Sequence, residues 1–298
     1  MNKPFLTVFT PTYNRAGTLT RTYRSLKKQT CKDFIWLIID DGSSDNTEDL
    51  VKEWMREEKS FMIQYIHKEN GGMHTAHNYA YRNIYTDINT CIDSDDIMPE
   101  DGVEKILKKW EEVKNKDYAG IIALDADMTT GKVLGKGFPK DMYETTVSGY
   151  YAAGGKGDKK LIYRTDVINN YPEYPVFEGE KYLSLAYKYR LIDQDYKMAV
   201  LDDIVCLVEY QADGSSRNMI HQYYKNPKGF AFWRTVRMQY ANSKKRVFID
   251  CIHYVAESRI AGNKHYIKES PQKILTILAF PAGRIWEMII RQRNKLRK

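Results

Sequence analysis

Asp93 and Asp95 stand one residue apart at the end of an apolar segment, Ile88–Asp93, that reads as a buried strand. Hard divalent cations prefer oxygen ligands, and Mg²⁺ commonly takes one or two carboxylates together with substrate phosphates. Negative charge gathered at a strand end is unfavourable unless a cation or a hydrogen-bond donor offsets it. This pair therefore indicates a site for Mn²⁺ or Mg²⁺. The same spacing recurs at Asp125 and Asp127, and we favour the first pair because of its neighbours.

Those neighbours are polar clusters that follow each of the first four expected strands. Any one of them could be a turn, since Asp-Gly and Asn-Gly are common turn dipeptides. In a parallel α/β sheet, however, ligands bind outside the carboxyl ends of the strands. Four clusters at one edge therefore predict a ligand site. They are residues 10–15 (TPTYNR), 40–45 (DDGSSD), 70–72 (NGG) and 93–96 (DSDD).

Strand-like and helix-like segments alternate through the first half of the chain. The run FIWLIID at 34–40 is almost wholly apolar, as expected of a strand buried on both faces. The alternation predicts an α/β fold with a mostly parallel, doubly wound (Rossmann-like) central sheet flanked by helices. The expected strands are 5–10, 34–40, 61–67, 88–93 and 118–124, and the expected helices are 17–29, 45–58, 75–85 and 99–115.

The second half is less regular and becomes helical toward its end. Residues 128–160 read as loops with short strands, 179–190 as a helix, and 199–210 as a short strand or two. From residue 218 the pattern is helical, with breaks near Pro and Gly residues. We therefore expect two domains, a nucleotide-binding and catalytic domain at 1–215 and a basic helical extension at 216–298.

Composition and charge exclude several classes of protein. With 43% hydrophobic residues, the 298-residue chain has too much apolar material to be disordered. Its four cysteines form no CxxC pair, so we expect neither a zinc site nor a disulfide framework. We expect a reducing, cytoplasmic compartment instead. We expect neither a signal peptide nor a membrane span. Residues 217–298 carry 18 Lys and Arg against 4 Asp and Glu, although the whole chain has a net charge of only +7.

Four motifs in this order resemble the family 2 glycosyltransferases of the GT-A fold: TPTYNR, IIDDGSSDNT, HKENGGMHTAHNYA and CIDSDDIMPED. The resemblance covers roughly residues 5–101 and continues more weakly to about 215. It implies a metal-dependent, inverting transfer of a hexosyl or N-acetylhexosaminyl group from a UDP-sugar. The implied acceptor is a glycan or a lipid-linked glycan in bacterial surface polysaccharide synthesis.

The resemblance also implies roles for individual residues. Tyr13 would stack on the base, Asp41 would accept a hydrogen bond from the imide N–H of uracil, and Asp93 and Asp95 would hold the metal. His77 stands in a triplet where the family often has Arg, and it is expected either on the donor or on a helix surface. The implied nucleotide-sugar contacts are Pro11, Tyr13, Arg15, Asp41, His77, Asp93, Ser94 and Arg217.

Inversion needs a base that takes the proton of the acceptor hydroxyl. The family places it in a Glu-Asp pair that opens a helix, about 80–100 residues past the metal motif. Here Lys181 stands where the Asp usually does. We favour Glu180 as the base, with Glu178 as the alternative. Asp202 and Asp203 are weaker candidates because they read as a turn between strands. Both glutamates are also the acids expected at a helix start.

The C-terminal segment has apolar residues at helical spacing with basic residues opposite. This suits an interfacial helix on anionic lipid, and we favour peripheral contact with the inner face of the cell membrane; docking on the protein's own core is the other interpretation. The apolar face comprises Ile274, Leu278, Ala282, Ile285, Trp286 and Ile289.

Two other classes of function fit less well. A nucleotidyltransferase or sugar-nucleotide pyrophosphorylase would be expected to show a Gly-rich basic signature near the first strand, where this chain has TPTYNR. A nucleic-acid-binding protein would use the basic tail, but it would leave the acidic clusters unexplained, because carboxylates repel phosphates. We therefore expect no nucleic-acid partner.

Overall fold

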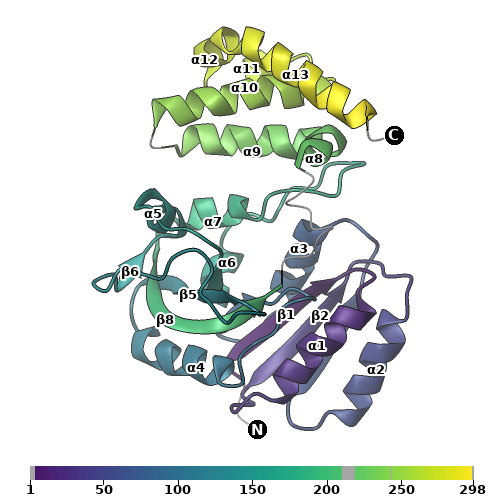
Figure 1. The fold of residues 1–298 in the computed structure, drawn as a ribbon, viewed down its shortest axis with the longest axis vertical. Helices are drawn as coiled ribbons and strands as arrows, with labels where there is room; N and C mark the ends of the chain where they lie inside the picture. Colours follow the sequence, from purple (N-terminus) through teal and green to yellow (C-terminus); the bar gives the residue numbers. More distant parts are fainter. Residues whose placement is uncertain (1–3, 210–218, 242, 297–298) are drawn as a thin grey trace. The chain divides into compact units, whose positions relative to one another are not determined.

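The computed structural model describes residues 4–209, 219–241 and 243–296. This part of the chain divides into two compact units, each described by itself below (Figure 1). The first comprises Met1–Glu173 and Lys188–Glu209, and the second comprises Tyr174–Tyr187 and Tyr210–Lys298.

The first unit is built on one sheet, which has eight strands in the described part of the chain, in the order β3-β2-β1-β4-β7-β5-β8-β6. β1, β2, β3 and β4 pair in parallel, as do β5 and β8, whereas β7 and β6 join antiparallel. The expected mixed α/β fold is confirmed. The strands are β1 (Leu6–Thr12), β2 (Phe34–Asp40), β3 (Met62–His67), β4 (Ile88–Cys91), β5 (Tyr118–Asp127), β6 (Glu144–Thr145), β7 (Lys159–Arg164) and β8 (Lys197–Val208).

Helices cover both faces of this sheet (Figure 1). α1 (Ala16–Lys27), α2 (Thr47–Glu57) and α4 (Gly102–Val113) contribute to one apolar core, in which Trp36 of β2 is fully buried. α3 (Met73–Asn83) lies on the other face, against Phe9 of β1. The shorter helices are α5 (Val147–Ala152), α6 (Thr165–Asn169) and α7 (Ala186–Ile192).

Three expectations about the second half were wrong. The segment expected to be a helix from 179 to 190 becomes helical only at Ala186, and Gly179 adopts φ +79° in a turn before it. Asp202 and Asp203 lie within the long strand β8 rather than in a turn. β5 continues to Asp127, so the second acidic pair lies on a strand and not after one.

The second unit is helical. α10 packs against both α9 and α13, and a buried Arg234 on α9 pairs with Glu257 and Asp250 on α10. In the described residues, no helix is both long enough and apolar enough to cross a membrane. The helices are α8 (Met219–Lys225), α9 (Pro227–Gln239), α10 (Lys244–Ile260), α11 (Tyr266–Glu269), α12 (Lys273–Leu278) and α13 (Phe280–Lys295).

Candidate active site

The acidic cluster follows the carboxyl end of β4. Asp93 and Asp95 are half-buried, and Asp96 is buried. Burial and then the charge of Asp93 raise the pKa of Asp95, while Arg15 and Arg21 act in the opposite direction. The Nη2 of Arg21 lies 3.4 Å from the backbone oxygen of Asp95, so two cationic side chains of the β1–α1 region border the cluster.

Lys160 of β7 is a buried cation beside this cluster that sequence reasoning missed. Its Nζ lies 3.3 Å from the backbone oxygen of Cys91 and 4.0 Å from Oδ1 of Asp125. Burial would lower the pKa of Lys160, but Asp125 and its acidic neighbours raise it. Lys160 stands in no motif, and only its position on an inserted antiparallel strand brings it to the acids.

The second acidic pair separates in space. Asp125 is 3% exposed, and burial raises its pKa to about 6 in spite of Lys160. Burial likewise raises the pKa of Asp96 to about 7. Asp127 instead faces solvent and accepts hydrogen bonds from the N–H and hydroxyl of Thr130. Asp127 is therefore the last residue of β5 and binds the turn that follows it, whereas Asp125 belongs to the buried acidic edge.

Asp93 and Asp95 suit a hard cation. Both offer carboxylate oxygens on one loop, and burial together with the charge of Asp93 raises the pKa of Asp95. Among the described residues, no three or more His, Cys, Asp or Glu side chains are arranged to hold a metal by themselves. A cation that keeps water or takes phosphate oxygens as further ligands fits such a donor set.

Asp41 holds the glycine turn that follows β3. Its Oδ1 accepts from the N–H of Gly71 at 2.9 Å and from Lys68, and its Oδ2 accepts from the N–H of Gly72 at 2.7 Å and from Asn70 at 3.3 Å. A carboxylate has about four acceptor positions, and four donors already use them. The geometry is that of a residue that orders the loop, and a contact of Asp41 with uracil stays a prediction.

The loops after β1 and β2 are joined by side-chain hydrogen bonds. Asn14, at φ +52°, accepts through its side-chain oxygen from the N–H of Ser44 at 2.7 Å, and its own N–H donates to the hydroxyl of Ser43. Asp45 accepts from the N–H of Ala16 at 3.2 Å. Tyr13 is 49% exposed beside these contacts, so its ring is accessible for stacking.

Two other residues of the nucleotide motifs are core or turn residues. His77 is 1% exposed, packs edge-on against Phe9, and shares a hydrogen bond of 3.2 Å with Tyr81. Burial lowers its pKa to about 3. The alternative of His77 on a helix surface is thus wrong, because the side chain is a neutral part of the core, and its contact with the donor stays a prediction. Asp40 accepts from the N–H of Ser43 and is a turn residue.

Of the remaining residues expected to contact the donor, Pro11 and Ser94 can be located in the structure and Arg217 cannot. Pro11 is buried near the carboxyl end of β1, and Ser94 is buried between the two aspartates of the cluster. Arg217 lies outside the described residues.

Glu180 lies in the second unit and binds the start of α9. Its two oxygens accept from the backbone N–H groups of Lys228 and Gly229, each at 2.8 Å. Burial raises its pKa in spite of these donors, and about two acceptor positions remain. Glu178 is exposed, and its backbone oxygen accepts from Nζ of Lys228 at 3.3 Å.

A cavity of about 380 Å³ lies within the second unit. Phe177, Phe232 and Tyr254 form aromatic walls, and Lys228, which contacts both glutamates, lies at its edge. Aromatic walls with a few polar groups are typical of small-ligand sites.

A match to a sequence-family model shows the family to which the chain belongs. The model of glycosyl transferase family 2 matches residues 7–171, which is more than half of the chain. The chain belongs to glycosyl transferase family 2. This glycosyltransferase is 27% identical to the glycosyltransferase GlyA of Streptococcus pneumoniae over 192 residues, which is 63% of this chain and 25% of GlyA. It spans no more than a quarter of the length of the first curated relatives that it matches.

Solved structures share the fold of this family 2 glycosyltransferase. TarS 1–349 of S. aureus matches this chain with a TM-score of 0.58 and 18% identity, and the match covers 96% of this chain and 91% of TarS 1–349. The same protein has also been solved in complex with UDP-GlcNAc. The mannosyltransferase PcManGT of Pyrobaculum calidifontis, in complex with GDP-Man and Mn²⁺, has a TM-score of 0.57 and 14% identity, covering 97% and 88%. At these identities the likeness concerns the fold alone.

Proposed function

We propose that this glycosyltransferase moves a hexosyl or N-acetylhexosaminyl group from a UDP-sugar to a glycan or lipid-linked glycan, with inversion and with Mn²⁺ or Mg²⁺. The observation that carries the proposal is the acidic edge after β4, where Asp93 and Asp95 are crowded beside Arg15 and Arg21. The TarS complex with UDP-GlcNAc and the PcManGT complex with Mn²⁺ support the choice of donor and metal by analogy of fold.

The donor side would use the ordered loops of the first unit. Tyr13 offers an exposed ring to the base, and Asp41 keeps the glycine turn in place. The bound cation would offset the charge that develops on the leaving diphosphate. Asp93 and Asp95 would hold that cation, with Arg15 as a further cationic group at the phosphates. Asp41 contributes here by ordering the backbone.

The acceptor side would use the second unit. Glu180 has a raised pKa and free acceptor capacity, both of which suit a general base. The cavity of the second unit, between Phe177 and Phe232, would take the acceptor sugar. Glu178 is the alternative base because it is exposed on the same segment.

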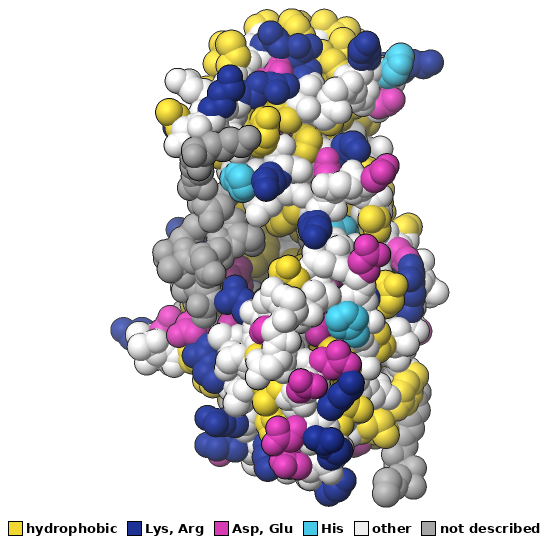
Figure 2. Space-filling model, turned by 90° about the vertical axis from the view of Figure 1, so that its right-hand side faces the viewer, with side chains coloured by type: hydrophobic (Ala, Val, Ile, Leu, Met, Phe, Trp, Pro, Cys, Tyr) yellow, Lys and Arg dark blue, Asp and Glu magenta, His cyan; other side chains and the backbone are white. Residues whose placement is uncertain are grey.

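The C-terminal helices would contact an anionic membrane at its cytoplasmic face, where a lipid-linked acceptor is presented. The expected apolar face is corrected in part, because Trp286 donates to His253 at 3.1 Å and so packs on α10. Large apolar side chains nevertheless remain exposed on α12 and α13, among basic residues (Figure 2). They are Ile274, Ile277, Leu278, Phe280, Ile285, Met288 and Leu296.

A nucleotide-sugar screen with Mn²⁺ tests the proposed donor and metal, with released UDP as the readout. Asp95→Asn keeps the size of the side chain and removes its charge, so UDP release should fall to background while the melting temperature is retained. Asp127→Asn is the matched control and should be fully active, because Asp127 faces solvent. Full activity of Asp95→Asn, or UDP release that persists without Mn²⁺ and without Mg²⁺, would contradict the proposal.

A further inference from the structure

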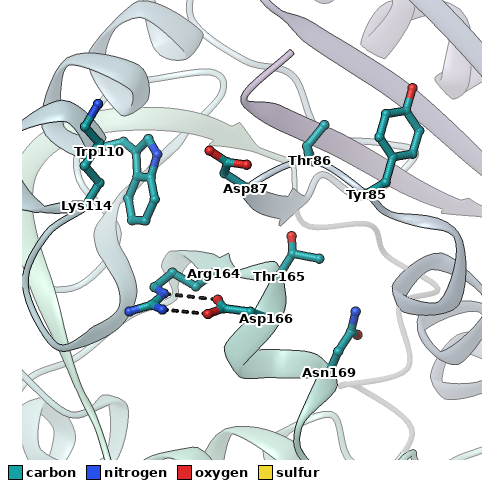
Figure 3. Close-up of a pocket in the computed structure, with 9 residues that line it drawn as sticks. All are labelled: Tyr85, Thr86, Asp87, Trp110, Lys114, Arg164, Thr165, Asp166 and Asn169. Carbon is teal, nitrogen blue, oxygen red and sulfur yellow. Dashed lines mark hydrogen bonds and ion pairs between the residues drawn. The ribbon is translucent and has the colours of Figure 1, made fainter. Parts of the chain in front are cut away.

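A second cavity of the first unit opens at the amino end of β4, at the opposite edge of the sheet from Asp93 and Asp95. Its volume is about 440 Å³, and nine side chains that line it are drawn in Figure 3. They come from the segment before β4, from the end of α4, and from β7 and α6. The residues that matter here are Tyr85, Asp87, Trp110, Arg164, Asp166 and Asn169.

Trp110 supplies a hydrogen-bond donor to this cavity. The side chain is 6% exposed, and no hydrogen-bond partner for its indole N–H exists among the described residues. Figure 3 shows the indole ring directed into the space between Asp87 and Arg164. Buried N–H groups are nearly always paired, so this group indicates that an acceptor atom of a ligand belongs in the cavity.

The cavity is lined by equal numbers of positively and negatively charged side chains. Arg164 forms a two-pronged contact with Asp166, with N–O distances of 3.1 and 2.6 Å, and Lys114 pairs with Glu111 at 2.6 Å. Because both cations are paired, the cavity does not suit a phosphate or a nucleotide. It offers carboxylate, amide and hydroxyl groups beside the aromatic ring of Trp110.

This combination matches the chemistry of a sugar. A pyranose ring has C–H groups that pack on an aromatic side chain, and hydroxyls that both donate and accept hydrogen bonds. The cavity volume lies in the usual range for small-ligand sites. We propose that this cavity binds a neutral sugar unit of a glycan, as a second carbohydrate site remote from the acidic edge. None of the residues that carry this inference belongs to the proposed catalytic site, so either can fail alone.

Saturation-transfer NMR on the full chain, with cellobiose, maltose, lactose and N,N′-diacetylchitobiose as probes, tests the inference. At least one disaccharide should give signals. Asn169→Ala and Trp110→Phe should each weaken its binding about tenfold, as the loss of a ligand hydrogen bond predicts. Arg164→Ala should weaken it similarly. Arg82→Ala is the matched control, because Arg82 pairs with Glu173 outside the cavity as Arg164 pairs with Asp166 inside it.

Melting curves of each variant keep the test decisive, since Asn169 is exposed and its substitution should leave the fold intact. Binding that survives in Asn169→Ala and Arg164→Ala would place the sugar elsewhere and overturn the inference. The absence of binding by all four disaccharides to the wild-type protein would also overturn it. Donor-dependent UDP release should be unchanged in Asn169→Ala, which separates this site from the proposed reaction.

Discussion

At the scale of single residues, the carboxylates in the sequence motifs differ in how many hydrogen bonds they already accept. Asp41 accepts from four donors, so it works as a fixed part of its loop. Glu180 accepts from two and keeps capacity for a proton. Residue type and spacing in the sequence could identify both Asp41 and Glu180 as candidate site residues. Only their hydrogen bonds in the structure distinguish a residue that orders a loop from one that could take a proton.

Asp125 predicts a pH dependence of stability. Its pKa is raised to about 6 in the folded protein, above the value of about 3.9 for an unfolded chain, so the native state binds more protons between these values. The contribution of Asp125 to the free energy of unfolding should therefore fall as the pH rises from about 4 to about 6. Asp125→Asn cannot titrate, so its stability relative to wild type should rise over that window by an amount on the order of 2–3 kcal/mol.

Urea unfolding of both proteins at several pH values measures this difference. Asp127→Asn is the control, because hydrogen bonds from Thr130 lower the pKa of Asp127, so this variant should show no such rise. A stability difference between Asp125→Asn and wild type that stays constant from pH 4 to 7 would contradict the assignment of Asp125 to the buried edge.

At the scale of elements, Glu180 links catalysis to the start of a helix. Its carboxylate binds the first N–H groups of α9, so a substitution by Gln, which keeps one acceptor oxygen, weakens a cap and removes a candidate base. Glu180→Gln should lower acceptor-dependent transfer roughly 10²–10⁴-fold. It should also lower stability by about 0.5–2 kcal/mol, which a melting curve separates from the loss of activity. UDP binding should be nearly unchanged.

Glu178→Gln is the companion variant, and it should retain most of its activity and its full melting temperature. Loss of transfer in Glu178→Gln with an active Glu180→Gln would move the base to Glu178. If both variants transfer sugar normally, the base lies on another segment.

The elements also show what the sequence could and could not predict. The strand at Phe34–Asp40 was found to the residue, because a continuous apolar run bounded by polar residues has few alternatives. The antiparallel insertion of β7 between β4 and β5 was not expected, since pairing partners far apart in sequence leave no local pattern. Lys160 and the role of Asp125 were missed for that reason, and His77 was misplaced because burial depends on packing against Phe9.

At the scale of the whole molecule, the exposed apolar side chains of α12 and α13 predict binding to anionic vesicles. Leu278 is 63% exposed among basic residues, and Leu278→Ser should weaken co-sedimentation with phosphatidylglycerol vesicles about tenfold or more, given the roughly 1.5–3 kcal/mol for burying a leucine. Ile249→Ser, on α10 and 43% exposed, is the matched control and should bind normally. Equal binding by both variants, or no preference for anionic over phosphatidylcholine vesicles, would contradict the membrane proposal.

The division of the chain into its two units has a consequence for how the protein is made. Tyr174–Tyr187 is translated before β8, yet its aromatic side chains pack on Phe230 and Phe232, which the ribosome adds some forty residues later. The sheet of the first unit, in turn, is incomplete until β8 has been synthesised, because β8 pairs between β5 and β6. Neither unit is complete when the other begins, so synthesis interleaves them, and no single cut in the polypeptide yields two intact halves.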